Sequence, residues 1–261
     1  MKTLHIGSLP FKDINQAIHY TFQYDIPTLF SLPQLDQDEW LGLDVLLKTE
    51  VASGDFDDLK VKSLSHAKIE NYKPAYVEEF KKKLSHTGKK EMKLQCVGPV
   101  TLHSIIKRFR PIEYIEVALF LKKLYAHIGS FFPDEMDMIF FMDEPFLAQN
   151  FDSLPFFEEV YRDANALYDT FVVHCCDHLN QAQLKQIHYP LHLDLALYQN
   201  DQTKPSPMAI GIANESLQLR AFDLEQGEFI APACGLGLKS EAYCWQILQQ
   251  LKTIKSQIHQ G

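Results

Sequence analysis

The sequence lacks several features that would assign it to common classes. None of its 261 residues belongs to an apolar stretch of about 18 residues, the length that crosses a membrane. The first residues lack the apolar core and cleavage site of a secretion signal. Lys and Arg number 25 against 34 Asp and Glu, which gives a net charge of −9, whereas nucleic-acid binders normally carry excess positive charge. We therefore expect neither a membrane nor a nucleic acid as partner.

Glycine, proline and cysteine are also sparse. The 11 Gly and 13 Pro exclude collagen-like and low-complexity chains. Five cysteines are an odd number for a disulfide framework, and a chain of this length can bury a core without one. We therefore expect a cytoplasmic protein with free thiols. No repeat and no Ser/Gly-rich linker divides the chain, so we expect one domain over residues 1–261.

Short apolar runs alternate with amphipathic stretches along the chain. The runs suit strands buried on both faces, as in a parallel sheet. We predict strands at Leu4–Ile6, Thr28–Phe30, Lys93–Val97, Met138–Met142, Thr170–His174, Leu191–Leu195, Met208–Ile212 and Glu228–Ala231. Helical spacing predicts helices at Asp13–Tyr24, Pro74–Leu84, Ile112–Phe132, Pro155–Tyr168, Gln181–Ile187 and Ser240–Ile258. Eight strands alternating with helices predict an α/β fold, a single (β/α)8 TIM barrel, with an open doubly wound sheet as the alternative.

A His-Cys-Cys segment ends the fifth predicted strand. Because side chains alternate along a strand, His174 and Cys176 point the same way and Cys175 points the other. One imidazole and one thiolate suit zinc, and Cys234, after the eighth predicted strand, is a candidate third ligand. A fourth ligand would be water or one of two acids, Asp194 and Glu144. The alternative is that these cysteines are small buried core residues.

Two acids follow the fourth predicted strand directly. Asp143 and Glu144 are costly there unless they are hydrogen-bonded or used. Either one acid caps the next helix, or the pair is catalytic, with Asp143 binding an amine or acting as a base. After the first strand, Gly7 and Ser8 can present backbone N–H groups to an anionic group. Four histidines near the predicted strands are weaker candidates for binding: His5, His103, His178 and His192.

The strand-end segments, taken in order, resemble a known superfamily. The segments are His5–Pro10, Leu32–Leu35, Gly98–Leu102, Asp143–Pro145, His174–Cys176 and Ala233–Gly237. They resemble the uroporphyrinogen decarboxylase/cobalamin-independent methionine synthase superfamily. The closest likeness is to short single-barrel proteins similar to the C-terminal catalytic domain of cobalamin-independent methionine synthase. The resemblance runs from residue 4 to residue 250.

This resemblance implies a TIM barrel and a zinc-dependent S-methyltransferase of methionine biosynthesis. The enzyme would move a methyl group from a corrinoid or methyltetrahydrofolate to a small thiol such as homocysteine. The implied zinc ligands are His174, Cys176, Cys234 and Asp194, the last in place of a typical Glu. The implied substrate-binding residues are Ile6, Gly7, Ser8 and Asp143.

The sequence departs from methionine synthase at two motifs that concern the methyl donor. An aromatic folate-binding stretch is replaced by His103-Ser104-Ile105-Ile106, and a His-Ser-Pro motif by Asn214-Glu215-Ser216. We therefore expect a corrinoid, free or on a partner protein, to serve as donor at least as well as folate. One alternative is a decarboxylase like uroporphyrinogen decarboxylase, although its N-terminal arginines are missing, since the first Arg is Arg108. The other is a catalytically degenerate barrel that only binds a ligand.

Overall fold

A seven-stranded parallel sheet forms the centre of the molecule. The computed structural model describes residues 1–35, 41–54, 57–198, 209–213 and 228–258. The strand order is β1-β9-β8-β7-β6-β5-β4, and every neighbouring pair is parallel. The strands are β1 (Lys2–Thr3), β4 (Glu91–Val97), β5 (Asp137–Asp143), β6 (Thr170–Cys175), β7 (Leu191–Asp194), β8 (Ala209–Ala213) and β9 (Phe229–Pro232). A separate antiparallel pair, β2 (Ala52–Ser53) and β3 (Lys60–Val61), is absent from the predicted set.

An eighth extended segment closes this sheet into a barrel. Thr28 forms a parallel bridge with Lys93 of β4, and the N–H of Leu29 donates to the Lys93 carbonyl at 2.8 Å. On the other side of the segment, the N–H of Ile26 donates to the carbonyl of Thr3 at 3.1 Å. Because β1 also pairs with β9, the hydrogen bonds run around a complete ring. The predicted TIM-barrel fold is therefore confirmed, and the open doubly wound sheet is excluded.

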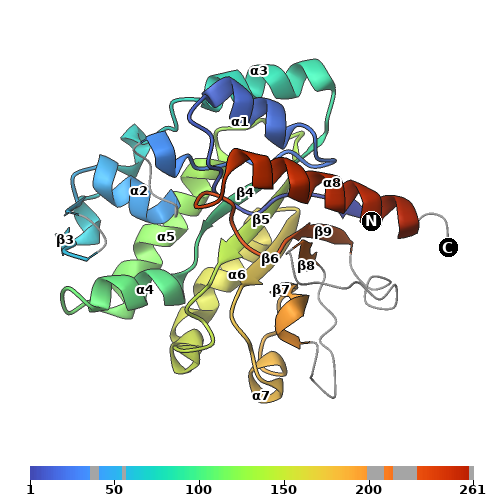
Figure 1. Cartoon of the computed structure of the whole chain (residues 1–261). Coiled ribbons are helices and arrows are strands. Elements are labelled where there is room, and N and C mark those ends of the chain that lie inside the picture. The colour runs from blue at the N-terminus through green and yellow to red at the C-terminus, as the bar shows by residue number, and fades with distance from the viewer. Residues whose placement is uncertain (36–40, 55–56, 199–208, 214–227, 259–261) are drawn as a thin grey trace.

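Helices cover the outside of the strands (Figure 1). They are α1 (Ile14–Thr21), α2 (Leu41–Lys48), α3 (Val77–Thr87), α4 (Pro99–Lys107), α5 (Tyr114–Gly129), α6 (Glu158–Leu167), α7 (Gln181–Leu184) and α8 (Glu241–Ile258). All six predicted helices are present, with ends that differ by a few residues, whereas α2 and α4 are absent from the predicted set. Among the described residues, no helix is both long and apolar enough to cross a membrane.

Side chains alternate between the barrel interior and the layer beneath the helices. On β5, Ile139 and Phe141 belong to the interior cluster, whereas Phe140 and Met142 pack outward in the larger core. The interior cluster also contains Leu4, Ile6, Ile26, Val172, Ala209, Phe229 and Ala231. Continuing this alternation to the strand ends turns Asp143 and His174 toward the interior. The carboxyl ends of the strands thus bring polar side chains together at one mouth of the barrel.

Candidate metal and substrate site

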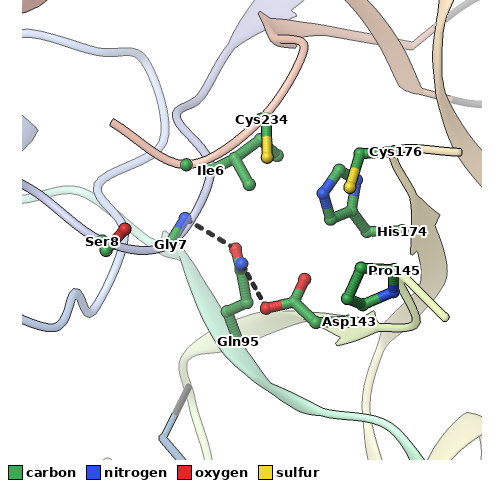
Figure 2. A pocket seen from close by; sticks show the side chains of 10 residues that line it. Ile6, Gly7, Ser8, Gln95, Asp143, Pro145, His174, Cys176 and Cys234 are labelled. Carbon is green, nitrogen blue, oxygen red and sulfur yellow. Dashed lines mark hydrogen bonds between the residues drawn. The ribbon is translucent and has the colours of Figure 1, made fainter. Parts of the chain in front are cut away.

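A cavity of about 110 Å³ lies at the carboxyl ends of the strands (Figure 2). It is lined by Ile6, Gly7, Ser8, Gln95, Asp143, Pro145, His174, Cys176, Cys234 and Gly235. These residues come from the ends of β4, β5 and β6 and from the segments that follow β1 and β9. The described lining therefore holds two thiols, one imidazole and one carboxyl, but no lysine or arginine.

Three lining residues form a cluster with metal-ligand chemistry. One ligand atom from each of His174, Cys176 and Cys234 lies within 4.8 Å of the others. In Figure 2 the imidazole and both sulfurs turn toward the same space. Around a tetrahedral zinc ion, Zn–S and Zn–N distances of about 2.3 and 2.0 Å separate neighbouring ligand atoms by roughly 3.3–3.8 Å. The three residues therefore fit one zinc ion after small side-chain shifts.

The two thiols of the cluster differ in acidity. Cys176 and Cys234 hydrogen bond to each other, and Cys234 also hydrogen bonds to His174. These contacts lower the pKa of Cys234 below its usual range, whereas the bond to Cys234 and burial raise the pKa of Cys176. Cys175 is fully buried and points away, with its Sγ 3.6 Å from the carbonyl oxygen of Asp177. The contacts with Cys176 and His174 therefore favour the thiolate form of Cys234, the form that binds a metal.

Asp143 is positioned by a chain of hydrogen bonds from β4. Its Oδ2 accepts from Gln95 Nε2 at 2.5 Å. Gln95 Oε1 in turn accepts from the N–H of Gly7 at 2.9 Å and from Lys93 Nζ (Figure 2 shows the first of these). The other carboxyl oxygen, Asp143 Oδ1, is buried and has no hydrogen-bond partner among the described residues. Burial raises the pKa of Asp143, and an unpaired carboxyl oxygen at a cavity wall is a natural acceptor for a cationic donor.

Gly7 and Ser8, the predicted anion cradle, both line the cavity, but the Gly7 N–H is engaged within the protein. Gly7 has a left-handed φ of +42°, and a Cβ there would lie 2.6 Å from Gln95 Nε2. This conformation directs the Gly7 N–H to Gln95, so that N–H is not free for a substrate carboxylate. Ser8 Oγ accepts from the N–H of Gly237, and the Ser8 carbonyl accepts from the N–H of Leu236. Ser8 thus holds the segment that carries Cys234 against the segment that follows β1.

Glu144 lies outside the cavity, unlike its neighbour Asp143. Its carboxylate accepts from two backbone N–H groups in the first turn of α4, at 3.0 and 2.7 Å, and from Tyr161 Oη at 2.5 Å. Gly98, which precedes α4, leaves room for it, since a Cβ there would lie 2.3 Å from the carboxylate. Burial raises the pKa of Glu144 to about 7. Glu144 therefore caps α4, a helix that precedes its strand, and not the next helix along the chain as predicted. This placement gives no support to the predicted catalytic role.

The predicted fourth ligand, Asp194, is not part of the metal-ligand cluster. Its Oδ1 accepts from the N–H of Ala196 at 2.9 Å, and burial raises its pKa. Strand register instead places His192 directly beside His174, and the two Nδ1 atoms are 2.6 Å apart. Register between strands cannot be read from a sequence, so the sequence alone indicates His192 only as a weak candidate.

The other candidate histidines lie away from the cavity. Like His192, the candidates His5, His103 and His178 do not line it. His5 is fully buried and hydrogen bonds through Nε2 to Thr21 of α1. The Asn214-Glu215-Ser216 segment, which replaces the His-Ser-Pro motif, lies outside the residues that the structure describes. The described site therefore consists of the metal-ligand cluster, the Asp143 carboxyl and the groups that hold them.

Comparisons with known proteins bear on the fold. No family model and no curated protein matches the chain in sequence. A B12-independent methionine synthase from Shewanella sp. W3-18-1, solved with selenomethionine, matches with a TM-score of 0.62 and 16% identity over 99% of this chain and 97% of that one. A Listeria monocytogenes protein assigned as a vitamin-B12-independent methionine synthase matches with a TM-score of 0.61 and 13% identity over 97% and 96%. The chain has the methionine synthase barrel fold. The resemblance noted in the sequence is thereby confirmed at the level of the fold.

Proposed function

We propose that this protein is a zinc-dependent methyltransferase that transfers a methyl group to a small thiol such as homocysteine. The observation that carries the proposal is the cluster of His174, Cys176 and Cys234 in one cavity with the unpaired Asp143 Oδ1. Three protein ligands with a fourth position open are typical of catalytic zinc. The solved proteins that share the fold are described as methionine synthases, and one of them was solved with the methionine analogue selenomethionine.

The metal-ligand cluster, Asp143 and Gln95 each have a part in this reaction. Zinc on the three ligands would lower the pKa of an acceptor thiol and so supply a thiolate at neutral pH. Asp143 Oδ1 accepts hydrogen bonds from the acceptor's ammonium group, while Gln95 fixes the other carboxyl oxygen. The acceptor sulfur forms the new bond to the methyl carbon, and the electron pair of the broken bond stays with the donor. Holding the thiol in one orientation favours the in-line geometry of this transfer.

Metal content tests the zinc site directly. Purified, reduced protein is expected to hold about one zinc ion per chain, as a three-ligand site requires. Cys176→Ser and Cys234→Ser are each expected to lose most of the metal. Cys175→Ser is the matched control and keeps it, because that side chain points away from the cluster. Native protein that holds no transition metal after zinc addition would contradict the proposal.

We further propose that a methyl-corrinoid serves as donor at least as well as methyl-folate. His103, Ile105 and Ile106 are buried in α4, with His103 stacked on Tyr114 at 4.3 Å, so this segment offers no ring to a pterin. The net charge of −9 provides no basic field for a polyglutamate tail. Methionine formation from homocysteine is measured with each donor in parallel. Turnover with methyl-folate and none with methylcobalamin would reverse this assignment.

A further inference from the structure

His174 and His192 form a hydrogen-bonded pair beneath the metal-ligand cluster. They lie opposite each other in the β6–β7 ladder, and their Nδ1 atoms are 2.6 Å apart. Their ring centroids are 4.7 Å apart, with an interplanar angle of 51°. His192 is fully buried and His174 nearly so, and His192 does not line the cavity. His192 therefore contacts the cavity lining through His174.

A hydrogen bond between two ring nitrogens needs one hydrogen between them. A neutral imidazole carries its hydrogen on one nitrogen and accepts with the other. When Nε2 of His174 binds a metal, that nitrogen has no hydrogen, so the hydrogen of the ring must lie on Nδ1. Nδ1 of His192 then accepts it. The remaining nitrogen of His174 is Nε2, and the His174 ring also hydrogen bonds to Cys234.

The surroundings of His192 hold its ring in this place. Phe141 lies on one side, at 5.7 Å between ring centroids. Gly211 of β8 leaves space on another side, since a Cβ there would lie 3.1 Å from His192 Cε1. His192 Nε2 is buried and has no partner among the described residues. An unpaired buried nitrogen is costly, so packing alone would favour an apolar side chain at this position.

We propose that His192 is a positioning residue of the metal site, which fixes the ring of His174 and its tautomer so that Nε2 faces Cys176 and Cys234. The inference rests on the proposed zinc site and adds a residue to it. Metal-bound histidines usually direct their second nitrogen to a carboxylate, a carbonyl or water, and loss of such a partner weakens metal binding by about 10- to 100-fold. Here a second imidazole takes that place.

Zinc affinity, measured by competition with a chelator of known affinity, tests this role. His192→Leu removes the acceptor and is expected to weaken zinc binding by about 10- to 100-fold. His192→Asn is expected to restore most of the affinity, because the Asn side-chain oxygen can take the place of Nδ1 as acceptor. His5→Leu is the matched control, since His5 is equally buried but hydrogen bonds to Thr21, and it is expected to bind zinc like the native protein.

The outcomes separate this inference from the proposed function. Native affinity in His192→Leu, or an equal loss in His5→Leu, would overturn the role of His192 and leave the zinc site standing. Native protein that binds no zinc would overturn both. If His192→Leu does not fold, nitrogen NMR of the native zinc-loaded protein tests the tautomer of His174 and its hydrogen bond to His192. The hydrogen is expected on His174 Nδ1, with a coupling across the hydrogen bond to His192 Nδ1, and metal on Nδ1 or an absent coupling would overturn the proposal.

Discussion

Lys93 and Asp143 place an amine and a carboxyl group in the buried part of the barrel. Lys93 is fully buried, donates to the His5 carbonyl at 3.0 Å, and lies 4.5 Å from the centre of the Phe141 ring. It also donates to Gln95 Oε1, as the N–H of Gly7 does. Two donors at that oxygen leave the amide nitrogen of Gln95 to face Asp143. The buried Lys93 amine thus sets, through Gln95, the orientation of the carboxyl in the cavity.

Asp143→Asn is expected to weaken acceptor binding much more than zinc binding. The substitution removes the charge that faces the ammonium group, which costs roughly 2–4 kcal/mol in a partly buried site. Titration of zinc-loaded protein with homocysteine measures the first effect, and metal analysis measures the second. Unchanged homocysteine affinity would remove Asp143 from the acceptor site.

Acceptor binding is also expected to weaken as the pH falls through about 6, the raised pKa of Asp143. Above this pH the carboxylate attracts an ammonium group, whereas below it the neutral carboxyl does not. Burial is the main cause of the shift, while the charges of His174 and Lys93 act against it. The affinity for homocysteine is measured from pH 5 to 8 in the native protein and in Asp143→Asn. If Asp143→Asn keeps the same pH dependence of homocysteine affinity below pH 7, that dependence belongs to another group.

Helix α4 depends on an acid from the neighbouring strand, because it has no cap of its own. Gly98 precedes the helix and offers no side chain, and the carboxylate of Glu144 supplies the missing acceptors. The predicted set lacks this helix, although Pro99 at its first position is a common start signal. The choice between a cap and a catalytic acid depended on which strand lies beside which helix. That proximity is tertiary, so the sequence alone left both alternatives open.

Glu144→Gln is expected to destabilise the fold by roughly 2–4 kcal/mol, because an amide replaces a carboxylate that accepts three hydrogen bonds. Glu113→Gln is the matched control, since Glu113 precedes α5 and makes no side-chain capping bond. Urea unfolding measures both variants. If Glu144→Gln is as stable as the control but has lost methyl transfer, Glu144 has a catalytic role after all.

Strand alternation and strand register differ in what a sequence reveals about them. Alternation along one strand is local, so it predicts that His174 and Cys176 share a side and that Cys175 does not. Register depends on hydrogen bonds between strands that are distant in the chain. It sets His192 level with His174, and this pairing could not be predicted. Asp194 instead pairs with Gly211 of the next strand.

At the scale of the whole molecule, the metal-ligand cluster joins distant parts of the chain. His174 and Cys176 belong to β6 and its end, whereas Cys234 follows β9, and only the fold brings them together. The number and order of the strands were predictable because buried parallel strands are continuous apolar runs. Closure of the ring by the segment around Thr28 rests on a single bridge and a few backbone bonds, too little to predict in detail.

Zinc is expected to stabilise the native fold, since it binds ligands that only the fold assembles. A metal at 100 times its dissociation constant adds about 2.7 kcal/mol to the free energy of unfolding. The shift in unfolding temperature is measured by thermal unfolding with added zinc and then with excess chelator. Cys234→Ser is expected to show almost none of it. An equal shift in this variant would place the stabilising metal elsewhere.

The contact between Cys176 and Cys234 also makes the cavity sensitive to oxidation. An oxidant that accepts two electrons, as the thiol proton of Cys176 leaves, would join the sulfurs in a disulfide once they approach to about 2.05 Å. A disulfide between Cys176 and Cys234 and a bound metal exclude each other, because both need the electron pairs of the two sulfurs. After removal of metal and mild oxidation, the thiols titrated in the denatured chain are expected to fall from five to three, and from four to two in Cys175→Ser. The fraction of chains that carry this disulfide would then set how much metal a preparation can bind.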